Sequence, residues 1–155
     1  MPQLKAGDKA PAFSLQDQSG ETVSLARFKG QKLLIYFYPK ANTPGCTIQS
    51  CHVRDARPAF AKKGVAVIGV SPDKPTAQQK FDEKYSLGFP LLADTEHAMA
   101  EAYGVWGEKS MYGRKYFGVV RSAFLVDGKG KIAGAWYKVS PGDTVPEAMA
   151  ALKKI

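Results

Sequence analysis

Two continuous apolar runs constrain the fold of this 155-residue chain more than any other feature. The first spans residues 32–38 and is stopped by Pro39, and the second spans residues 65–70. Such runs are typical of strands buried on both faces of a sheet. The segment between them, from Pro44 to about Lys62, has helical character. The order strand, helix, strand predicts a crossover unit whose two strands are parallel.

The remaining segments add hairpins and helices around this unit. Residues 12–15 and 21–24 flank a turn composition at 17–20 and predict a short N-terminal hairpin. No repeat, low-complexity tract or linker interrupts the sequence, so we predict one domain over residues 1–155. Its predicted fold is α/β, with a mixed central sheet flanked by helices on both faces. The other expected elements are helices at 75–85, 96–103 and 145–154, a strand at 89–92, and a hairpin of 122–126 with 131–137.

Charge and hydropathy argue against several classes of partner. The chain has 22 Lys and Arg against 14 Asp and Glu, a net charge of +8. This positive charge is scattered in short pairs such as Lys62-Lys63, with no known nucleic-acid motif beside them, so we expect a solvated basic surface and no nucleic-acid partner. The first seven residues lack the apolar core of a secretory signal, and no run of about 18 apolar residues is present. We therefore expect no membrane partner and a cytoplasmic, thiol-reducing location.

The two cysteines, Cys46 and Cys51, are separated by four residues. They are too close to clip a long loop and too few for a four-cysteine zinc site, so they are either idle or act on each other. With Thr43 as N-cap and Pro44 as the first helical residue, Cys46 falls in the first helical turn, where free backbone N–H groups and the helix dipole stabilise a thiolate. The same local pattern fits a small buried cysteine beside an ordinary helix cap equally well.

The spacing of the pair sets a geometric condition on any bond between them. Five positions along one α-helix give a rise of about 7.5 Å and a rotation of about 140°, so the two Cα atoms stand roughly 8 to 9 Å apart. A disulfide requires less than about 7 Å. A bond between Cys46 and Cys51 therefore requires local unwinding of the helix and would act as a conformational switch.

The pattern Pro39-x-x-x-Thr43-x-x-Cys46, with Cys51 five residues on, resembles the active-site loop of peroxiredoxins. More specifically it is similar to the Q subgroup, also called bacterioferritin comigratory proteins. The likeness continues at residues 104–110 and 121–127 and covers nearly the whole chain. It implies a thioredoxin-like fold and a thiol peroxidase that reduces hydrogen peroxide and organic hydroperoxides. Recycling by thioredoxin or a similar, glutaredoxin-like dithiol donor is also implied.

The resemblance also implies a role for each residue of the site. Cys46 is expected to be the peroxidatic cysteine and Cys51 the resolving cysteine, which forms a disulfide with it within the chain. Thr43 is expected to hydrogen-bond the thiolate and peroxide, Pro39 to shield the thiolate from water, and Arg121 to supply a cation beside the sulfur. No metal or organic cofactor is implied. A bridge within one chain does not demand a dimer, so we expect a monomer.

Arg121 has a supporting argument that does not depend on the family. It lies between apolar residues 119–120 and 123–126, and a guanidinium in a buried strand is costly unless it meets an anion. The alternative is an Arg121 that lies at the entrance of the strand and is exposed to solvent. Ala41 and Gln49 occupy positions where such loops often carry acidic residues, and we expect neither to touch the chemistry. In residues 106–117, aromatic residues alternate with Lys and Arg, and we expect this segment to pack as a loop near the active-site mouth.

Three other interpretations compete with the peroxidase. A zinc site of Cys46, Cys51, His52 and His97 has poor ligand spacing. A thiol–disulfide oxidoreductase acting on protein substrates would use the same two cysteines, although the Pro39, Thr43 and Arg121 set favours peroxide. In a basic binding module, both cysteines could be replaced without loss of function.

Overall fold

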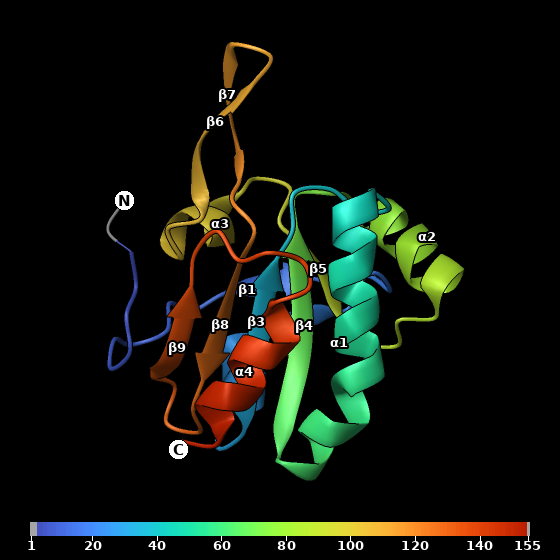
Figure 1. Cartoon of the computed structure of the whole chain (residues 1–155). Helices are drawn as coiled ribbons and strands as arrows, with labels where there is room; N and C mark the ends of the chain where they lie inside the picture. The colour runs from blue at the N-terminus through green and yellow to red at the C-terminus, as the bar shows by residue number, and fades with distance from the viewer. Residues whose placement is uncertain (1–2, 155) are drawn as a thin grey trace.

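The computed structural model describes residues 3–154 and has a five-stranded mixed sheet at its centre (Figure 1). The strand order is β5-β4-β3-β8-β9, in which β3, β4 and β5 are parallel and β8 and β9 run antiparallel to their neighbours. The predicted crossover of two parallel strands is thus confirmed as β3-α1-β4. The strands are β3 (Lys32–Phe37), β4 (Val65–Ser71), β5 (Leu91–Ala93), β8 (Ser122–Val126) and β9 (Ile132–Trp136).

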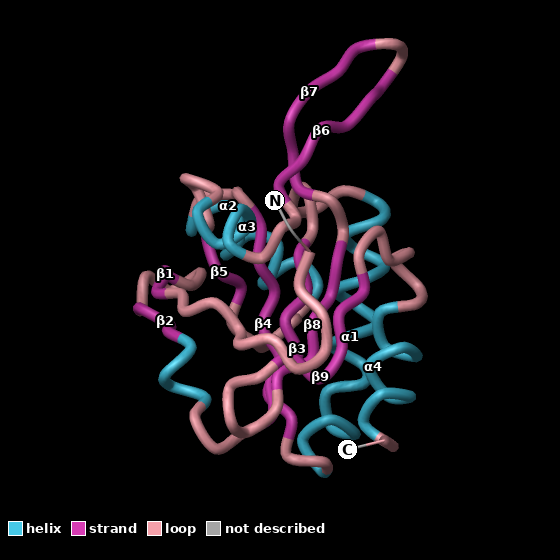
Figure 2. Tube along the Cα trace, turned by 90° about the vertical axis from the view of Figure 1, so that its left-hand side faces the viewer, coloured by secondary structure: helices cyan, strands magenta, loops and turns pink. Residues whose placement is uncertain are grey.

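Helices cover both faces of this sheet, as predicted. Helices α1 (Pro44–Lys62) and α4 (Thr144–Leu152) lie on one face, whereas α3 (Ala98–Ala102) lies on the other face with the N-terminal segment (Figure 2). Helix α2 (Pro75–Tyr85) packs beside the edge strand β5. The expected N-terminal hairpin is formed by β1 (Ser14–Gln16) and β2 (Thr22–Ser24) and is followed by a 3-10 turn, η1 (Leu25–Phe28).

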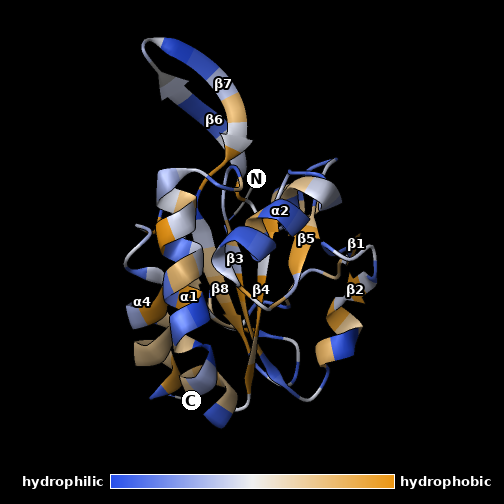
Figure 3. Cartoon of the chain, turned by 90° about the vertical axis from the view of Figure 1, so that its right-hand side faces the viewer, coloured by the Kyte–Doolittle hydropathy of each residue, from blue (hydrophilic) through white to orange (hydrophobic). Residues whose placement is uncertain are grey.

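The apolar core is split by the sheet into two clusters. Leu33, Ile35 and Phe37 of β3 pack into the cluster on the α3 side, and Leu34 and Tyr36 pack into the one beneath α1 and α4. In the hydropathy colouring, strands β4 and β5 are largely orange, the colour of apolar residues (Figure 3). A strand buried on both faces explains the uninterrupted apolar run in the sequence. Strand β3 leads directly into the loop before α1, and so the sheet positions the cysteine segment.

Residues 106–117 do not form a packed loop, and this expectation was wrong. They belong to a hairpin of β6 (Trp106–Met111) and β7 (Arg114–Val119), which projects from the body of the molecule (Figure 1). Its two turn residues, Tyr112 and Gly113, have φ angles of 53° and 78°. Two positive φ values in a two-residue turn match the twist of the flanking strands. The hairpin was missed because the first turn residue is a tyrosine rather than Asn, Asp or Gly.

Arg121 was expected in a buried strand but lies in the short link between β7 and β8. Pairing of β7 with β6 ends at Val119, and pairing of β8 with β3 begins at Ser122. The Arg121 carbonyl accepts a hydrogen bond from the Val139 N–H at 2.9 Å, which fixes the backbone of the link. The guanidinium is thus carried at the end of the sheet rather than within it. Within residues 3–154, no helix is long and apolar enough to cross a membrane.

Candidate active site

Cys46 occupies the first turn of α1, at the third helical residue, with only 1% of its surface exposed. The first intrahelical hydrogen bond runs from the Thr47 N–H to the Thr43 carbonyl, at 2.8 Å. The backbone N–H of Cys46 therefore lies among the helix N-terminal donors that have no intrahelical acceptor. This position exposes the sulfur to the positive end of the helix dipole.

Thr43 begins the helix with an extended backbone (φ −101°, ψ 158°), but its side chain does not cap it. Its hydroxyl instead donates to the Lys40 carbonyl, at 2.8 Å. Lys40 and Thr43 are three positions apart, and the backbone turns between them. Asn42, which lies in this turn, has a φ angle of 62°. Thr43 is therefore the N-cap residue, as predicted, but it makes no side-chain cap bond, and its hydroxyl donates to the Lys40 carbonyl rather than to the Cys46 sulfur.

Arg121 lies directly beside the Cys46 sulfur. Its Nη2 donates to Cys46 Sγ at 3.3 Å, and its Nη1 donates to Gln49 Oε1 at 2.7 Å. A guanidinium at this distance stabilises a thiolate over a thiol. Gly45 leaves room for the Arg121 guanidinium, since a Cβ atom at position 45 would stand 3.0 Å from Arg121 Nη2. A larger residue at position 45 would press against the guanidinium.

Gln49 holds the arginine and was missed by the sequence analysis, which expected it not to touch the chemistry. It is completely buried, and its Nε2 donates to the Thr144 hydroxyl at 2.9 Å while its Oε1 accepts from Arg121. Cys46 and Gln49 are three residues apart, so they share a face of α1. That spacing was the signal that could have identified Gln49. Through Thr144, the same amide links the start of α1 to the start of α4.

A second polar network anchors the loop before α1. The Ala41 N–H donates to Asp73 Oδ2 at 2.7 Å, and the Ser71 hydroxyl donates to the same oxygen at 2.7 Å. Gln78 Nε2 donates to the Ser71 hydroxyl at 2.8 Å, and the Tyr38 hydroxyl donates to Gln78 Oε1 at 2.5 Å. Sequence reasoning missed these residues too. The position of Asp73, just after β4, was the signal that could have identified this network. The carboxyl ends of neighbouring parallel strands meet at one edge of a sheet, so a residue after β4 lies near the loop after β3.

The other two predicted site residues lie close to this loop in the chain. Pro39 is half-buried two residues after the end of β3. Cys51 is half-buried within α1, and the thiols of Cys46 and Cys51 are both free. The helix is continuous across the pair, so the roughly 8 to 9 Å separation of the two Cα atoms in an intact helix applies.

Charged and ionisable neighbours shape the electrostatics of the site. Burial raises the pKa of Tyr36 well above its ordinary value, and the nearby Cys46 and Cys51 act in the same direction. Its hydroxyl shares a 2.8 Å hydrogen bond with that of Ser50. Partial burial and the Arg121 charge lower the pKa of Lys109, whereas Cys46 opposes this shift. Lys109 thus lies within electrostatic range of the site, although it was not among the predicted residues.

The zinc interpretation is not supported by the positions of its four candidate ligands. Within residues 3–154, no three or more His, Cys, Asp or Glu side chains gather closely enough to hold a metal ion. His52 is exposed on α1, and His97 stacks on Trp106 with ring centroids 3.9 Å apart. The four residues therefore do not form one site.

Comparisons with known proteins agree with this fold and site. The site has a buried cysteine at the start of a helix and an arginine beside its sulfur, and the fold has a mixed sheet between helices. The AhpC/TSA family model matches residues 6–135, and the chain belongs to this family. It is 55% identical over 129 residues to Peroxiredoxin Bcp of Escherichia coli (strain K12), covering 83% of each chain. The solved peroxiredoxin Q of Xanthomonas campestris matches with a TM-score of 0.89 and 36% identity, covering 96% of this chain and 97% of that one.

A solved bacterioferritin comigratory protein, also from Xanthomonas campestris, matches with a TM-score of 0.89 and 35% identity, covering 96% of this chain and 98% of that one. The fold is thus thioredoxin-like, as the resemblance implied. The chain is a peroxiredoxin of the Q, or bacterioferritin comigratory, type. It is accordingly a thiol-dependent peroxidase, an oxidoreductase that takes peroxides as substrates and requires a thiol reductant.

Proposed function

We propose that Cys46 is the peroxidatic cysteine and reduces hydrogen peroxide and organic hydroperoxides. The observation that carries this proposal is the 3.3 Å contact between Arg121 Nη2 and the buried Cys46 sulfur. The thiolate attacks one peroxide oxygen, so an S–O bond forms as the O–O bond breaks. The departing oxygen takes up a proton and leaves as water or an alcohol, and Cys46 becomes a sulfenic acid. The Xanthomonas campestris relative is described for alkyl peroxide reduction, which supports the inclusion of organic hydroperoxides.

The surrounding groups stabilise the negative charge that moves from sulfur to the departing oxygen. Arg121 faces the sulfur, and the free N–H groups of the first helical turn point to the same place. Thr43 exchanges its bond to the Lys40 carbonyl for one to the bound peroxide. Pro39, at the end of the same loop, shields the thiolate from water. No group outside the chain is needed for this displacement.

Cys51 then resolves the sulfenic acid. Its thiolate attacks the Cys46 sulfur, and an S–S bond forms as the S–O bond of the sulfenic acid breaks. The departing hydroxide takes up a proton from the solvent and leaves as water. This step requires the first turns of α1 to unwind, which breaks the Gln49 bond to Thr144 and the Arg121 bond to Cys46. Beyond Cys51 the helix is held more firmly, because Arg54 Nη1 donates to the Tyr85 carbonyl at 2.7 Å. Arg57 likewise donates to the Gly88 carbonyl, so we place the end of the unwinding segment before Arg54.

Thioredoxin or a glutaredoxin-like dithiol completes the cycle by reducing the Cys46–Cys51 disulfide and becoming oxidised itself. Unwinding brings the bond to the surface, next to the exposed Ile48 side chain. Both cysteines belong to one chain, so a monomer suffices for the whole cycle. A thiol-reducing compartment such as the cytoplasm would supply the donor.

The burial of Cys46 argues against the oxidoreductase alternative. A protein disulfide cannot reach a sulfur with 1% of its residue's surface exposed, whereas a small peroxide can enter with little movement. The basic binding module would not require the arginine to face the sulfur. Peroxide reduction is therefore the function that the geometry supports best.

Peroxide consumption by three forms of the protein tests this proposal. Wild type should turn over repeatedly with thioredoxin, and Cys46→Ser should be inert. Cys51→Ser should form a sulfenic acid that dimedone traps and then stall without a second thiol. Peroxide turnover by Cys46→Ser at the wild-type rate would overturn the assignment.

A further inference from the structure

Exposed aromatic side chains gather at one end of the molecule. Of the large hydrophobic side chains in the described chain, four are exposed: Tyr112 (99%), Phe117 (64%), Ile48 (49%) and Tyr116 (40%). The three aromatic residues belong to the β6–β7 hairpin, and Ile48 lies two residues after Cys46 on α1. The hairpin and the N-terminal end of α1 lie at the same end of the molecule (Figure 1).

Tyr112 at the hairpin tip is not explained by the fold. It is the first of the two turn residues, with φ 53°, a conformation in which Asn, Asp or Gly is preferred and a bulky side chain is disfavoured. Its side chain is 99% exposed, so almost no packing within the chain offsets this cost. An aromatic ring held at the end of a projecting hairpin is therefore suited to contact something outside the chain.

The charged residues of the hairpin are mostly cationic. Residues 106–119 contain three Lys or Arg, namely Lys109, Arg114 and Lys115, against the single acid Glu108. Lys115 forms an exposed ion pair with Glu108 at 3.5 Å, and Arg114 is also exposed. Lys109 donates to the Val119 carbonyl at 2.9 Å and lies closer to the body. The hairpin thus combines an aromatic tip with a net charge of +2, from 3 − 1.

The aromatic side chains do not share one face of the hairpin. Phe117 pairs with Glu108, whereas its neighbour Tyr116 pairs with Lys109, and successive side chains of a strand point to opposite faces. Tyr112 extends the apolar surface beyond both faces. A flat protein surface, including that of a second copy, would cover only one face at a time. A lipid headgroup layer surrounds an inserted finger on all sides.

We propose that the β6–β7 hairpin binds the surface of an anionic phospholipid bilayer. Tyr112 and Phe117 enter the headgroup region, where aromatic rings are favoured, and Arg114 and Lys115 contact lipid phosphates. With strands of six residues each, the finger reaches about 20 Å. The expectation of no membrane partner rested on absent spanning and signal segments, and peripheral contact of this kind requires neither. The proposal does not depend on the peroxidase chemistry.

Co-sedimentation of the full chain with vesicles tests the proposal. Wild type should sediment with vesicles of equal parts phosphatidylcholine and phosphatidylglycerol, and much less with phosphatidylcholine alone. Tyr112→Asn should lower the partition coefficient at least about fivefold while keeping the turn, because Asn-Gly suits it well. The double variant Arg114→Gln/Lys115→Gln should lower it roughly tenfold or more, since each cation near an anionic surface contributes about a fivefold gain.

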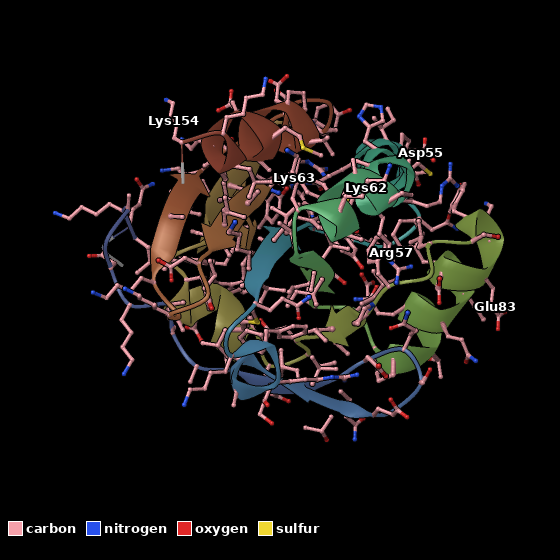
Figure 4. The ribbon with its side chains drawn as sticks, turned by 90° about the horizontal axis from the view of Figure 1, so that it is seen from below. Asp55, Arg57, Lys62, Lys63, Glu83 and Lys154 are labelled. Atoms are coloured by element: carbon pink, nitrogen blue, oxygen red, sulfur yellow. The ribbon has the colours of Figure 1, made fainter. Side chains whose placement is uncertain are left out.

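Lys62→Gln/Lys63→Gln is the matched control. It removes the same charge from the C-terminal end of α1, where Lys62 and Lys63 are labelled in the view from below (Figure 4). This variant should keep most of the wild-type binding. Failure of wild type to bind the mixed vesicles would overturn the proposal, as would an equal loss in both double variants. Unchanged binding by Tyr112→Asn would also overturn it. If wild type instead forms dimers and does not bind vesicles, and Tyr112→Asn is monomeric, the hairpin contacts a second copy of the chain and the proposal is overturned.

Discussion

Arg121 donates one hydrogen bond to the Cys46 sulfur at 3.3 Å and another to Gln49 Oε1 at 2.7 Å. The guanidinium is therefore shared between the reacting atom and a buried amide on the same helix. Its charge faces the sulfur while the amide, itself bonded to Thr144, sets its orientation. Charge and orientation can be removed separately by substitution, which makes each open to a test.

Replacing Arg121 with methionine removes the charge and keeps much of the side-chain volume. We expect sulfenic acid formation to slow by about two orders of magnitude, because a preorganised donor at developing charge contributes about 3 kcal/mol. Stopped-flow mixing with hydrogen peroxide measures this rate. Arg27→Met, at an exposed arginine of η1, is the matched control and should react normally. A loss of stability as large as the loss of rate in Arg121→Met would assign the arginine to structure alone.

Replacing Gln49 with glutamate keeps an acceptor for Arg121 but adds a negative charge on the face of α1 that carries Cys46. The carboxylate disfavours the thiolate and partly neutralises the arginine. We expect sulfenic acid formation to slow several-fold relative to wild type. Stopped-flow mixing of both proteins with hydrogen peroxide measures the two rates. Equal rates would mean that Gln49 has no electrostatic influence on the sulfur.

Replacing Thr144 with valine removes the acceptor that holds Gln49 to α4. Losing one hydrogen bond destabilises the closed helix by about 1 kcal/mol, so we expect disulfide formation to speed up about fivefold. Sulfenic acid formation should change far less. Thr76→Val on the exposed surface of α2 serves as the control. Slower disulfide formation in Thr144→Val would contradict the requirement for unwinding.

Alkaline pH should destabilise the protein through its buried tyrosines. Burial raises the pKa of Tyr36, Tyr38 and Tyr103 in the folded state. Between the ordinary tyrosine pKa of about 10 and these raised values, the unfolded chain binds fewer protons, so the free energy of unfolding falls as pH rises. Urea unfolding at a series of pH values above about 9 measures the slope. Tyr103→Phe should reduce it, and an identical slope in that variant would contradict the account.

Much of the fold could be predicted from the sequence because its signals are local. The run at 32–38 is buried on both faces, and the helix at Pro44–Lys62 begins where its proline indicates. The β6–β7 hairpin could not be predicted, because a tyrosine in its turn contradicts the usual residue preference. Local preferences identify elements wherever tertiary contacts agree with them.

The site was predictable only in part, for a related reason. Cys46 is placed by the helix start and so by local sequence, whereas the partners of Arg121 depend on how α1 meets the β7–β8 link. The Thr43 hydroxyl was expected to bond the thiolate and peroxide, but it donates to the Lys40 carbonyl across the turn that contains Asn42. Asp73 and Gln78 are brought to the loop by the parallel pairing of β3 and β4.

Peptide mapping by mass spectrometry after one equivalent of peroxide tests the central claim most directly. The claim is that Cys46 is oxidised first and that Cys51 reaches it when α1 unwinds. Wild type should lose two hydrogens and give a peptide in which Cys46 and Cys51 are joined, and Cys51→Ser should carry a single added oxygen on Cys46. Oxygen added to Cys51 while Cys46 stays reduced, or a fully oxidised wild type without the joined peptide, would contradict it.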